Sequence, residues 1–140
     1  MKHSKPLNCI ATCVSVDEIG SSNTSKYPGL ANADSEQRRL LYWKCAYVFM
    51  FTSMIHNKGV SHVVVTNDEN EVITEEGNIR EQLCTLGVQI IYSQFSVFKN
   101  IHGTSHFFRN AYFKIEAIKA LCDHFRDDNV RIAIFDNDCI

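Results

Sequence analysis

The residues best suited to chemistry in this 140-residue chain are two aspartates near its end, Asp136 and Asp138. They follow a short apolar run, 132–135, which is typical of a buried strand with both faces covered. Side chains two apart in an extended backbone point the same way, so both carboxylates can bind one cation. Mg²⁺ and Mn²⁺ prefer oxygen ligands and bridge to substrate phosphates. The spacing predicts a site for Mn²⁺ or Mg²⁺, although an acidic pair after a strand is also typical of a solvated turn.

The elements that must position these aspartates alternate between strands and helices. The hydrophobic periodicity predicts strands at 7–16, 60–66, 88–92 and 132–135, and helices at 36–56, 75–86 and from 107 or 109 to about 125. This alternation predicts a Rossmann-like α/β fold of three layers, with a mainly parallel sheet between helices. Because parallel strands end at one edge of a sheet, the two aspartates should lie at the carboxyl edge, where open α/β sheets bind ligands.

Two helices carry more detailed packing predictions. Helix 36–56 has one apolar stripe formed by Leu40, Trp43, Tyr47, Met50 and Met54. A second stripe covers much of the remaining surface, formed by Leu41, Val48, Phe51 and Ile55. We therefore expect this helix to be buried on more than one side. In the last helix the predicted inward stripe is Ala111, Ile115, Ile118 and Leu121 or Cys122.

Length and composition limit the classes of protein to be considered. The length suits one domain, 1–140, and the net charge of −2 gives no electrostatic reason to expect a nucleic-acid or membrane partner. The six cysteines lie in apolar segments without a C-x-x-C pair, which favours reduced thiols in a cytoplasmic protein. The most apolar stretch, 40–55, is interrupted by Lys44 and predicts no transmembrane segment.

The segment 109–138 resembles the GT-A glycosyltransferases, which use nucleotide-sugars. In that family a basic helix with aromatic residues precedes an apolar strand, and an Asp-x-Asp motif after it holds the divalent cation on the donor diphosphate. The earlier strands VVVTNDE and GVQIIY have the matching order. The resemblance extends over 7–140, but only about the last thirty residues are specific. It implies that Asp136 and Asp138 are the metal and diphosphate motif.

The resemblance also implies which residues bind the nucleotide. Asn67 and Asp68 match the position that contacts the base in this family. The other side of the pocket and the basic residues before the motif correspond to Ser15, Val16, Asp17, Arg109 and Lys114. A departing nucleoside diphosphate carries negative charge, which a cation and basic side chains stabilise. The alternatives are that Asn67 and Asp68 only form a turn, and that Lys114 is a solvated helix residue.

These features together predict a nucleotide-sugar-binding domain that is an incomplete GT-A domain. In the family the acceptor site and any catalytic base follow the Asp-x-Asp strand, so we expect donor binding without sugar transfer by this chain alone, to an acceptor that the sequence does not identify. The alternative is a non-enzymatic α/β binding or interaction module. IFDND also resembles the first motif of haloacid-dehalogenase-like phosphatases, with Asp136 as nucleophile, but that family carries the motif near its beginning.

The predicted sheet also has an edge. Unpaired apolar strands at such an edge favour association with further chains. We therefore expect a homo-oligomer or a partner chain that covers the exposed sheet edge.

Overall fold

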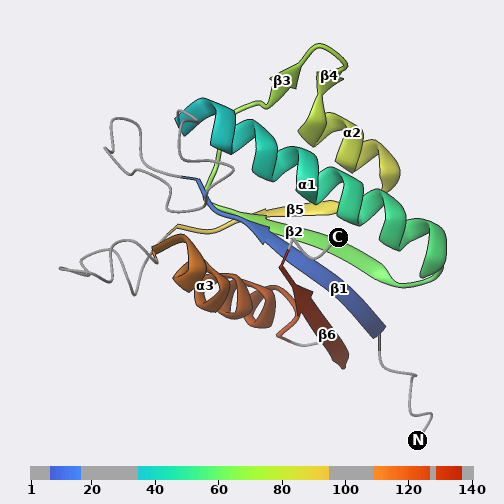
Figure 1. Cartoon of the computed structure of the whole chain (residues 1–140). Helices are drawn as coiled ribbons and strands as arrows, with labels where there is room; N and C mark the ends of the chain where they lie inside the picture. The colour runs from blue at the N-terminus through green and yellow to red at the C-terminus, as the bar shows by residue number, and fades with distance from the viewer. Residues whose placement is uncertain (1–6, 17–34, 95–108, 127–128, 137–140) are drawn as a thin grey trace, which may run out of the picture.

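The computed structural model describes residues 7–16, 35–94, 109–126 and 129–136 (Figure 1). Four strands form the main sheet: β1 (Leu7–Val14), β2 (Ser61–Thr66), β5 (Gln89–Tyr92) and β6 (Val130–Phe135). The helices are α1 (Ser35–His56), α2 (Ile79–Leu86) and α3 (Arg109–His124), and a small hairpin consists of β3 (Ile73–Thr74) and β4 (Gly77–Asn78). The predicted alternation of strands and helices is confirmed.

The main sheet has the strand order β5-β2-β1-β6, and each neighbouring pair is parallel. In the register Val14 pairs with Thr66, Thr66 with Tyr92, and Thr12 with Phe135. The carboxyl ends of all four strands therefore meet at one edge. The predicted parallel sheet of an α/β fold is confirmed.

Helices cover both faces of this sheet, which gives three layers (Figure 1). On one side α1 and α2 pack over the sheet, and their buried residues include Trp43, Met50 and Leu83. On the other side α3 buries Phe113 and Leu121 against β1 and β2. Because β1 and β2 are covered on both faces, their ends are held firmly at the carboxyl edge.

The last strand, β6, differs from the prediction because, among the described residues, only one of its faces is well covered. Ile132 and Ile134 pack against the α3 layer. Arg131, Ala133 and Phe135 are exposed on the other face, where the Phe135 ring contacts Phe49 of α1 with centroids 5.7 Å apart. An apolar run of four residues does not reveal whether a strand lies at the centre or at the edge of a sheet. In this fold β6 pairs with β1 alone among the described strands, so the expectation of two covered faces was wrong.

The predicted packing of α1 is partly wrong. Trp43 and Met50 of the first stripe are fully buried, and Leu40, Tyr47 and Met54 pack against that core. The second stripe is not buried, since Leu41, Val48, Phe51 and Ile55 are 40 to 52 % exposed. Periodicity identifies both stripes, but only one of them faces the sheet.

The inward stripe of α3 was also predicted incorrectly. Leu121 is buried as expected, but Ile115 and Ile118 are 48 % and 45 % exposed. Phe113, Glu116 and Ala117 are the residues that lie inside. Because α3 has apolar residues on two faces, its sequence is compatible with either face turned inward. The face that is buried includes Glu116, which made it look less apolar than the other.

The second helix begins four residues later than predicted because residues 73–78 form the hairpin β3–β4. Gly77 has φ +115°, a conformation that favours glycine at this tight turn. Asn78 caps α2, and its side-chain oxygen accepts a hydrogen bond from the backbone N–H of Arg80 at 3.1 Å. At the other end Gly87 is the left-handed C-terminal cap.

Among the described helices, none has the length and apolar character needed to cross a membrane.

Candidate functional site

The carboxyl edge of the sheet contains a change in winding direction. The chain proceeds from β1 to β2 and then to β5 on one side, whereas β6 lies on the other side of β1. The strand order therefore reverses between β1 and β6. In open α/β sheets ligands bind outside the carboxyl ends of the strands at such a switch point. We call this region, at the ends of β1 and β6, the β1–β6 crevice; the name refers to its place in the strand order and not to a measured cavity.

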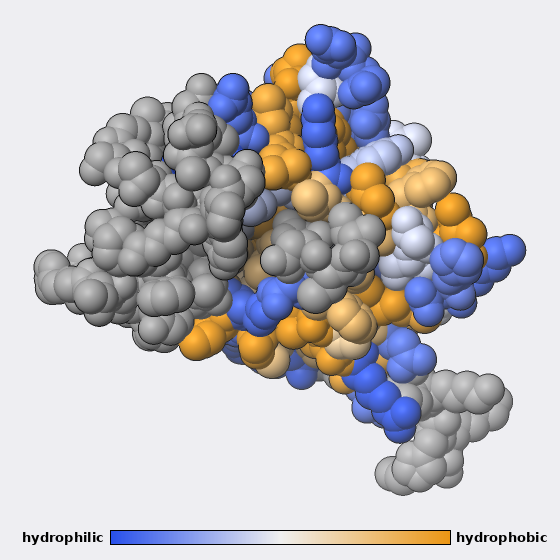
Figure 2. All heavy atoms as spheres, in the orientation of Figure 1, coloured by the Kyte–Doolittle hydropathy of each residue, from blue (hydrophilic) through white to orange (hydrophobic). Residues whose placement is uncertain are grey.

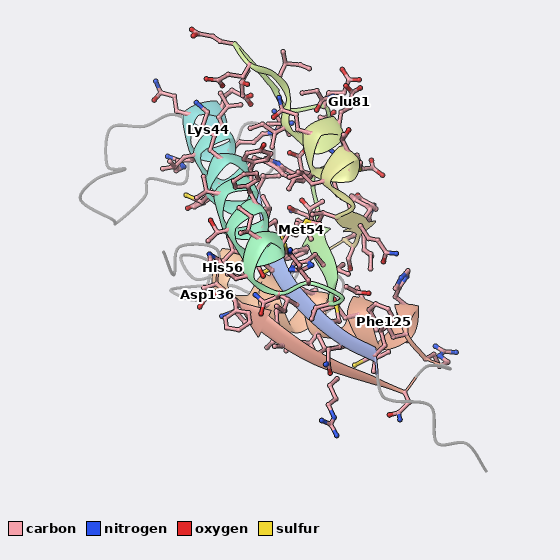
Figure 3. All side chains as sticks on the ribbon, turned by 90° about the vertical axis from the view of Figure 1, so that its right-hand side faces the viewer. Lys44, Met54, His56, Glu81, Phe125 and Asp136 are labelled. Atoms are coloured by element: carbon pink, nitrogen blue, oxygen red, sulfur yellow. The ribbon has the colours of Figure 1, made fainter. Side chains whose placement is uncertain are left out.

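Two predicted site residues meet at the β1–β6 crevice. Asp136 follows the end of β6 (Figure 3), and its carboxylate forms an ion pair with the ammonium group of Lys114 on α3. The side chains of Lys114 and Asp136 are 35 % and 52 % exposed, so the pair is open to solvent and to ligands. The packing of α3 beside β6 thus brings together Lys114 and Asp136, which are 22 residues apart in the sequence.

The backbone under this ion pair is tied together by Thr12. Its hydroxyl group donates a hydrogen bond of 2.8 Å to the carbonyl oxygen of Phe135, across the end of β1 and β6. This bond holds the residue before Asp136 against β1. The strand end that presents the carboxylate is therefore fixed, although the carboxylate itself is exposed.

Cys13 adjoins the same pair. Burial raises the pKa of its thiol to about 11; the charge of Lys114 lowers this pKa, and the charge of Asp136 raises it. The thiol is accordingly protonated and a poor nucleophile at neutral pH. Sequence analysis missed Cys13 as a neighbour of the site, because only the register of β1 and β6 brings it there.

The second aspartate of the motif, Asp138, lies outside the described residues, as do Asp17 and the side chain of Arg109, the residue at which α3 begins. Within the described part of the chain, no group of three or more His, Cys, Asp or Glu residues is arranged to hold a metal ion. Of the two aspartates predicted to bind the metal, the structure therefore describes only Asp136.

Asn67 and Val16, predicted for opposite sides of the pocket, bind each other. The Asn67 side-chain oxygen accepts a hydrogen bond of 2.8 Å from the Val16 N–H. The Asn67 amide donates one of 3.0 Å to the Val16 carbonyl oxygen. Asn67 thus fixes the backbone beyond β1, beside Ser15. These two bonds use the side-chain groups that a nucleotide base would otherwise contact.

Asp68 is buried in a network of hydrogen bonds rather than exposed at the edge. Its Oδ2 accepts hydrogen bonds from Arg39 Nε at 2.6 Å and Trp43 Nε1 at 2.9 Å. Its Oδ1 accepts from the backbone N–H of Asn70 at 3.1 Å. This last bond closes a turn, which is the alternative that the sequence left open for Asp68.

The same network fixes α1 to the segment after β2. Arg39 also donates to the carbonyl oxygen of Glu71 at 2.7 Å, and the guanidinium of Arg80 lies 5.4 Å from the centre of the Trp43 ring. Burial lowers the pKa of Arg39, but hydrogen bonding and the charge of Asp68, with a contribution from Glu36, raise it overall. Sequence analysis missed Arg39 and Trp43, whose only signal was a basic and an aromatic residue four apart on α1.

A hollow in the surface lies at the end of β5. It has a volume of about 450 Å³, and α3 contributes Glu116, Lys119 and Asp123 to its lining, opposite Tyr92 and Ser93. Both signs of charge line this hollow, so its electrostatics do not select an anionic or a cationic ligand. The β1–β6 crevice is the better candidate because it coincides with the switch point.

Comparison of the chain with models of protein families, with curated proteins and with solved structures found no match.

Proposed function

We propose that the β1–β6 crevice binds the diphosphate of a nucleotide-sugar donor through a divalent cation, as in a glycosyltransferase-like donor-binding domain. The observation that carries this proposal is the Lys114–Asp136 pair at the switch point of a parallel sheet. A carboxylate and an ammonium group side by side match the two parts of such a ligand, a cation and an anionic diphosphate.

The residues at the crevice fit a hard cation. Asp136 offers an exposed carboxylate on a fixed strand end, and Asp138 follows two residues later. In the proposed site both carboxylates hold Mn²⁺ or Mg²⁺, which neutralises charge on the diphosphate. Lys114 then turns its ammonium group from Asp136 toward a phosphate oxygen.

Asn67 and Asp68 have positioning roles in this proposal. Their hydrogen bonds fix the backbone of Val16, just beyond β1, and the turn after β2. A base that bound through Asp68 would have to replace hydrogen bonds from Arg39 and Trp43. Leaving these buried donors without an acceptor costs about 1–3 kcal/mol each. The Val16 backbone is equally engaged, because its N–H and its carbonyl oxygen are both bonded to Asn67.

The test is calorimetric titration of the protein with UDP and with GDP, with and without Mn²⁺. We expect binding that requires the metal and weakens at least about tenfold in Asp136→Ala and in Asp138→Ala, the fold-change of losing about 1.4 kcal/mol. Lys114→Met should weaken nucleotide binding without abolishing the metal requirement.

Asp123→Ala is the matched control, because Asp123 is an exposed α3 carboxylate paired with Arg126 instead of Lys114. It should bind as the wild type does. Equal binding by wild type and Asp136→Ala, or binding indifferent to Mn²⁺, would contradict the proposal. Mixing with a nucleotide-sugar and water should release no sugar beyond the uncatalysed rate, because we propose donor binding without transfer.

The second candidate function is a non-enzymatic interaction module. It is favoured by the exposed apolar residues of α1, which are unusual on the surface of an isolated domain. Absence of nucleotide binding under all metal conditions would leave this candidate as the better one.

A further inference from the structure

The outward face of α1 carries a regular apolar pattern. We define the outer stripe as Leu41, Lys44, Val48, Phe51 and Ile55, which lie at alternating intervals of three and four residues. This spacing places them on one face of the helix. All except Lys44 are apolar, and those four are 40 to 52 % exposed.

Among the described residues, the outer stripe belongs to neither of the two core clusters. The opposite side of α1 supplies Trp43, Ala46 and Met50 to the core over the sheet. Lys44, on the stripe, and Met54, which packs against that core, lie on different sides of α1 (Figure 3). Figure 2 shows hydrophobic surface on the front of the molecule, where α1 runs in Figure 1. A helix of 22 residues with apolar stripes on two sides is suited to pack on two sides.

Three of the five residues of the outer stripe, Leu41, Val48 and Ile55, are arranged symmetrically along the helix. Leu41 and Ile55 each lie seven residues from Val48, so reversing the helix direction about Val48 superimposes one apolar residue on the other. An interface between two identical chains related by a twofold axis requires such a self-complementary surface. An antiparallel pair of α1 helices, centred on Val48, satisfies this requirement.

The antiparallel arrangement opposes the dipoles of the two helices, which is favourable. Glu36, in the first turn of α1, is paired within its own chain, because its carboxylate lies 2.9 Å from the guanidinium of Arg39.

A membrane surface is a less suitable partner for the outer stripe of α1 than a second copy of the chain. Helices that lie on anionic membranes are rich in Lys and Arg on the polar face. Here the outer stripe includes a single basic residue, and the whole chain has a net charge of −2. We propose that α1 pairs with α1 of a second copy of this chain through the outer stripe, antiparallel and centred on Val48.

The experiment is sedimentation velocity of the full chain over concentrations on the order of 1–100 µM, which covers affinities common for such contacts. We expect a monomer–dimer equilibrium for the wild type. Val48→Glu places two like charges against each other at the twofold axis and should raise the dimer Kd at least about 100-fold. Val48 is 44 % exposed, so the variant should fold normally, which circular dichroism checks.

Ile115→Glu is the matched control. It makes the same kind of change at an apolar residue that is 48 % exposed, but on α3 in the opposite layer. It should leave the dimer Kd unchanged. Leu41→Glu and Ile55→Lys should each weaken the dimer, and the double variant should restore it, because residue 41 of one chain faces residue 55 of the other only in the antiparallel direction.

A wild type that stays monomeric at the highest concentration would overturn the proposal, and so would a Val48→Glu variant that dimerises normally. Equal losses in Val48→Glu and Ile115→Glu would place the interface elsewhere. A monomer that binds anionic phosphatidylserine vesicles through Val48 would assign the face to a membrane instead. Failure of the Leu41→Glu/Ile55→Lys double variant to restore the dimer would contradict the antiparallel arrangement.

Discussion

Asp68 shows how a single buried carboxylate organises the polypeptide after β2. Its side chain is 1 % exposed and accepts hydrogen bonds from a guanidinium, an indole and a backbone amide. Burial of a charge is costly unless it is paired and hydrogen-bonded, and each of these partners reduces that cost. The carboxylate thereby connects α1 to the turn that follows β2.

We expect Asp68→Asn to lower the free energy of unfolding by about 3 kcal/mol, because the change leaves Arg39 with only the exposed Glu36 as an ionic partner and turns one buried acceptor into a donor. Urea denaturation measures this loss. Asp123→Asn removes a carboxylate from an exposed ion pair and should cost less than about 1 kcal/mol. A loss below about 1 kcal/mol for Asp68→Asn would show that the network is dispensable.

Cys13 provides a pH-dependent report on the proposed site. With a pKa raised to about 11, its alkylation by iodoacetamide should still rise about tenfold per pH unit between about pH 7 and 10. An ordinary thiol levels off above about pH 8.5. The same shift predicts that stability falls as pH rises from about 9 toward 11, because the unfolded chain loses this proton first.

Two variants should move the Cys13 profile in opposite directions. Asp136→Asn removes a charge that raises the pKa, so alkylation should become faster. Lys114→Met removes a charge that lowers the pKa, so alkylation should become slower. In both variants the pKa of Cys13 should remain above that of an ordinary thiol, since burial is the largest cause of the shift. Peptide-resolved mass spectrometry separates Cys13 from the other cysteines, and a wild-type rate that levels off near pH 9 would contradict the assignment.

At the scale of elements, the sequence was sufficient for the strands and helices of the main fold. Their apolar periods are regular, and parallel strands must end at a common edge. The place of Asp136 at the carboxyl edge could therefore be predicted, whereas Lys114 was named only through the family resemblance. The contact itself depends on how α3 lies beside β6, which no local pattern contains.

Other features of these elements depended on tertiary packing. Whether β6 is covered on one face or two is decided by its place beside β1 at the edge of the described sheet. Which stripe of α1 or α3 faces inward is decided by the sheet, because both helices are apolar on two sides. The hairpin at 73–78 depends on a turn at Gly77. It was not predicted, because part of it lies in the segment 75–86, whose pattern is typical of a helix.

At the scale of the whole molecule, the two proposed surfaces belong to different layers. The β1–β6 crevice lies at the carboxyl edge of the sheet, with Lys114 supplied by α3. The outer stripe lies on α1, which covers the opposite face of the sheet. Mutational effects at sites that share no contacts are generally additive. Donor binding and dimerisation should therefore be separable by mutation.

We accordingly expect that a variant of either surface loses one function and keeps the other. Val48→Glu should be monomeric and should bind UDP with Mn²⁺ within about twofold of the wild type, because the two sites share no side chain. Asp136→Ala should lose metal-dependent UDP binding and keep the dimer Kd of the wild type. The double variant should show both losses, each of the size seen in the single variants. Calorimetry and sedimentation on the same four preparations measure both quantities. A Val48→Glu variant that folds but loses UDP binding would mean that dimerisation completes the nucleotide site, and the crevice would then have to be regarded as a shared site of two chains.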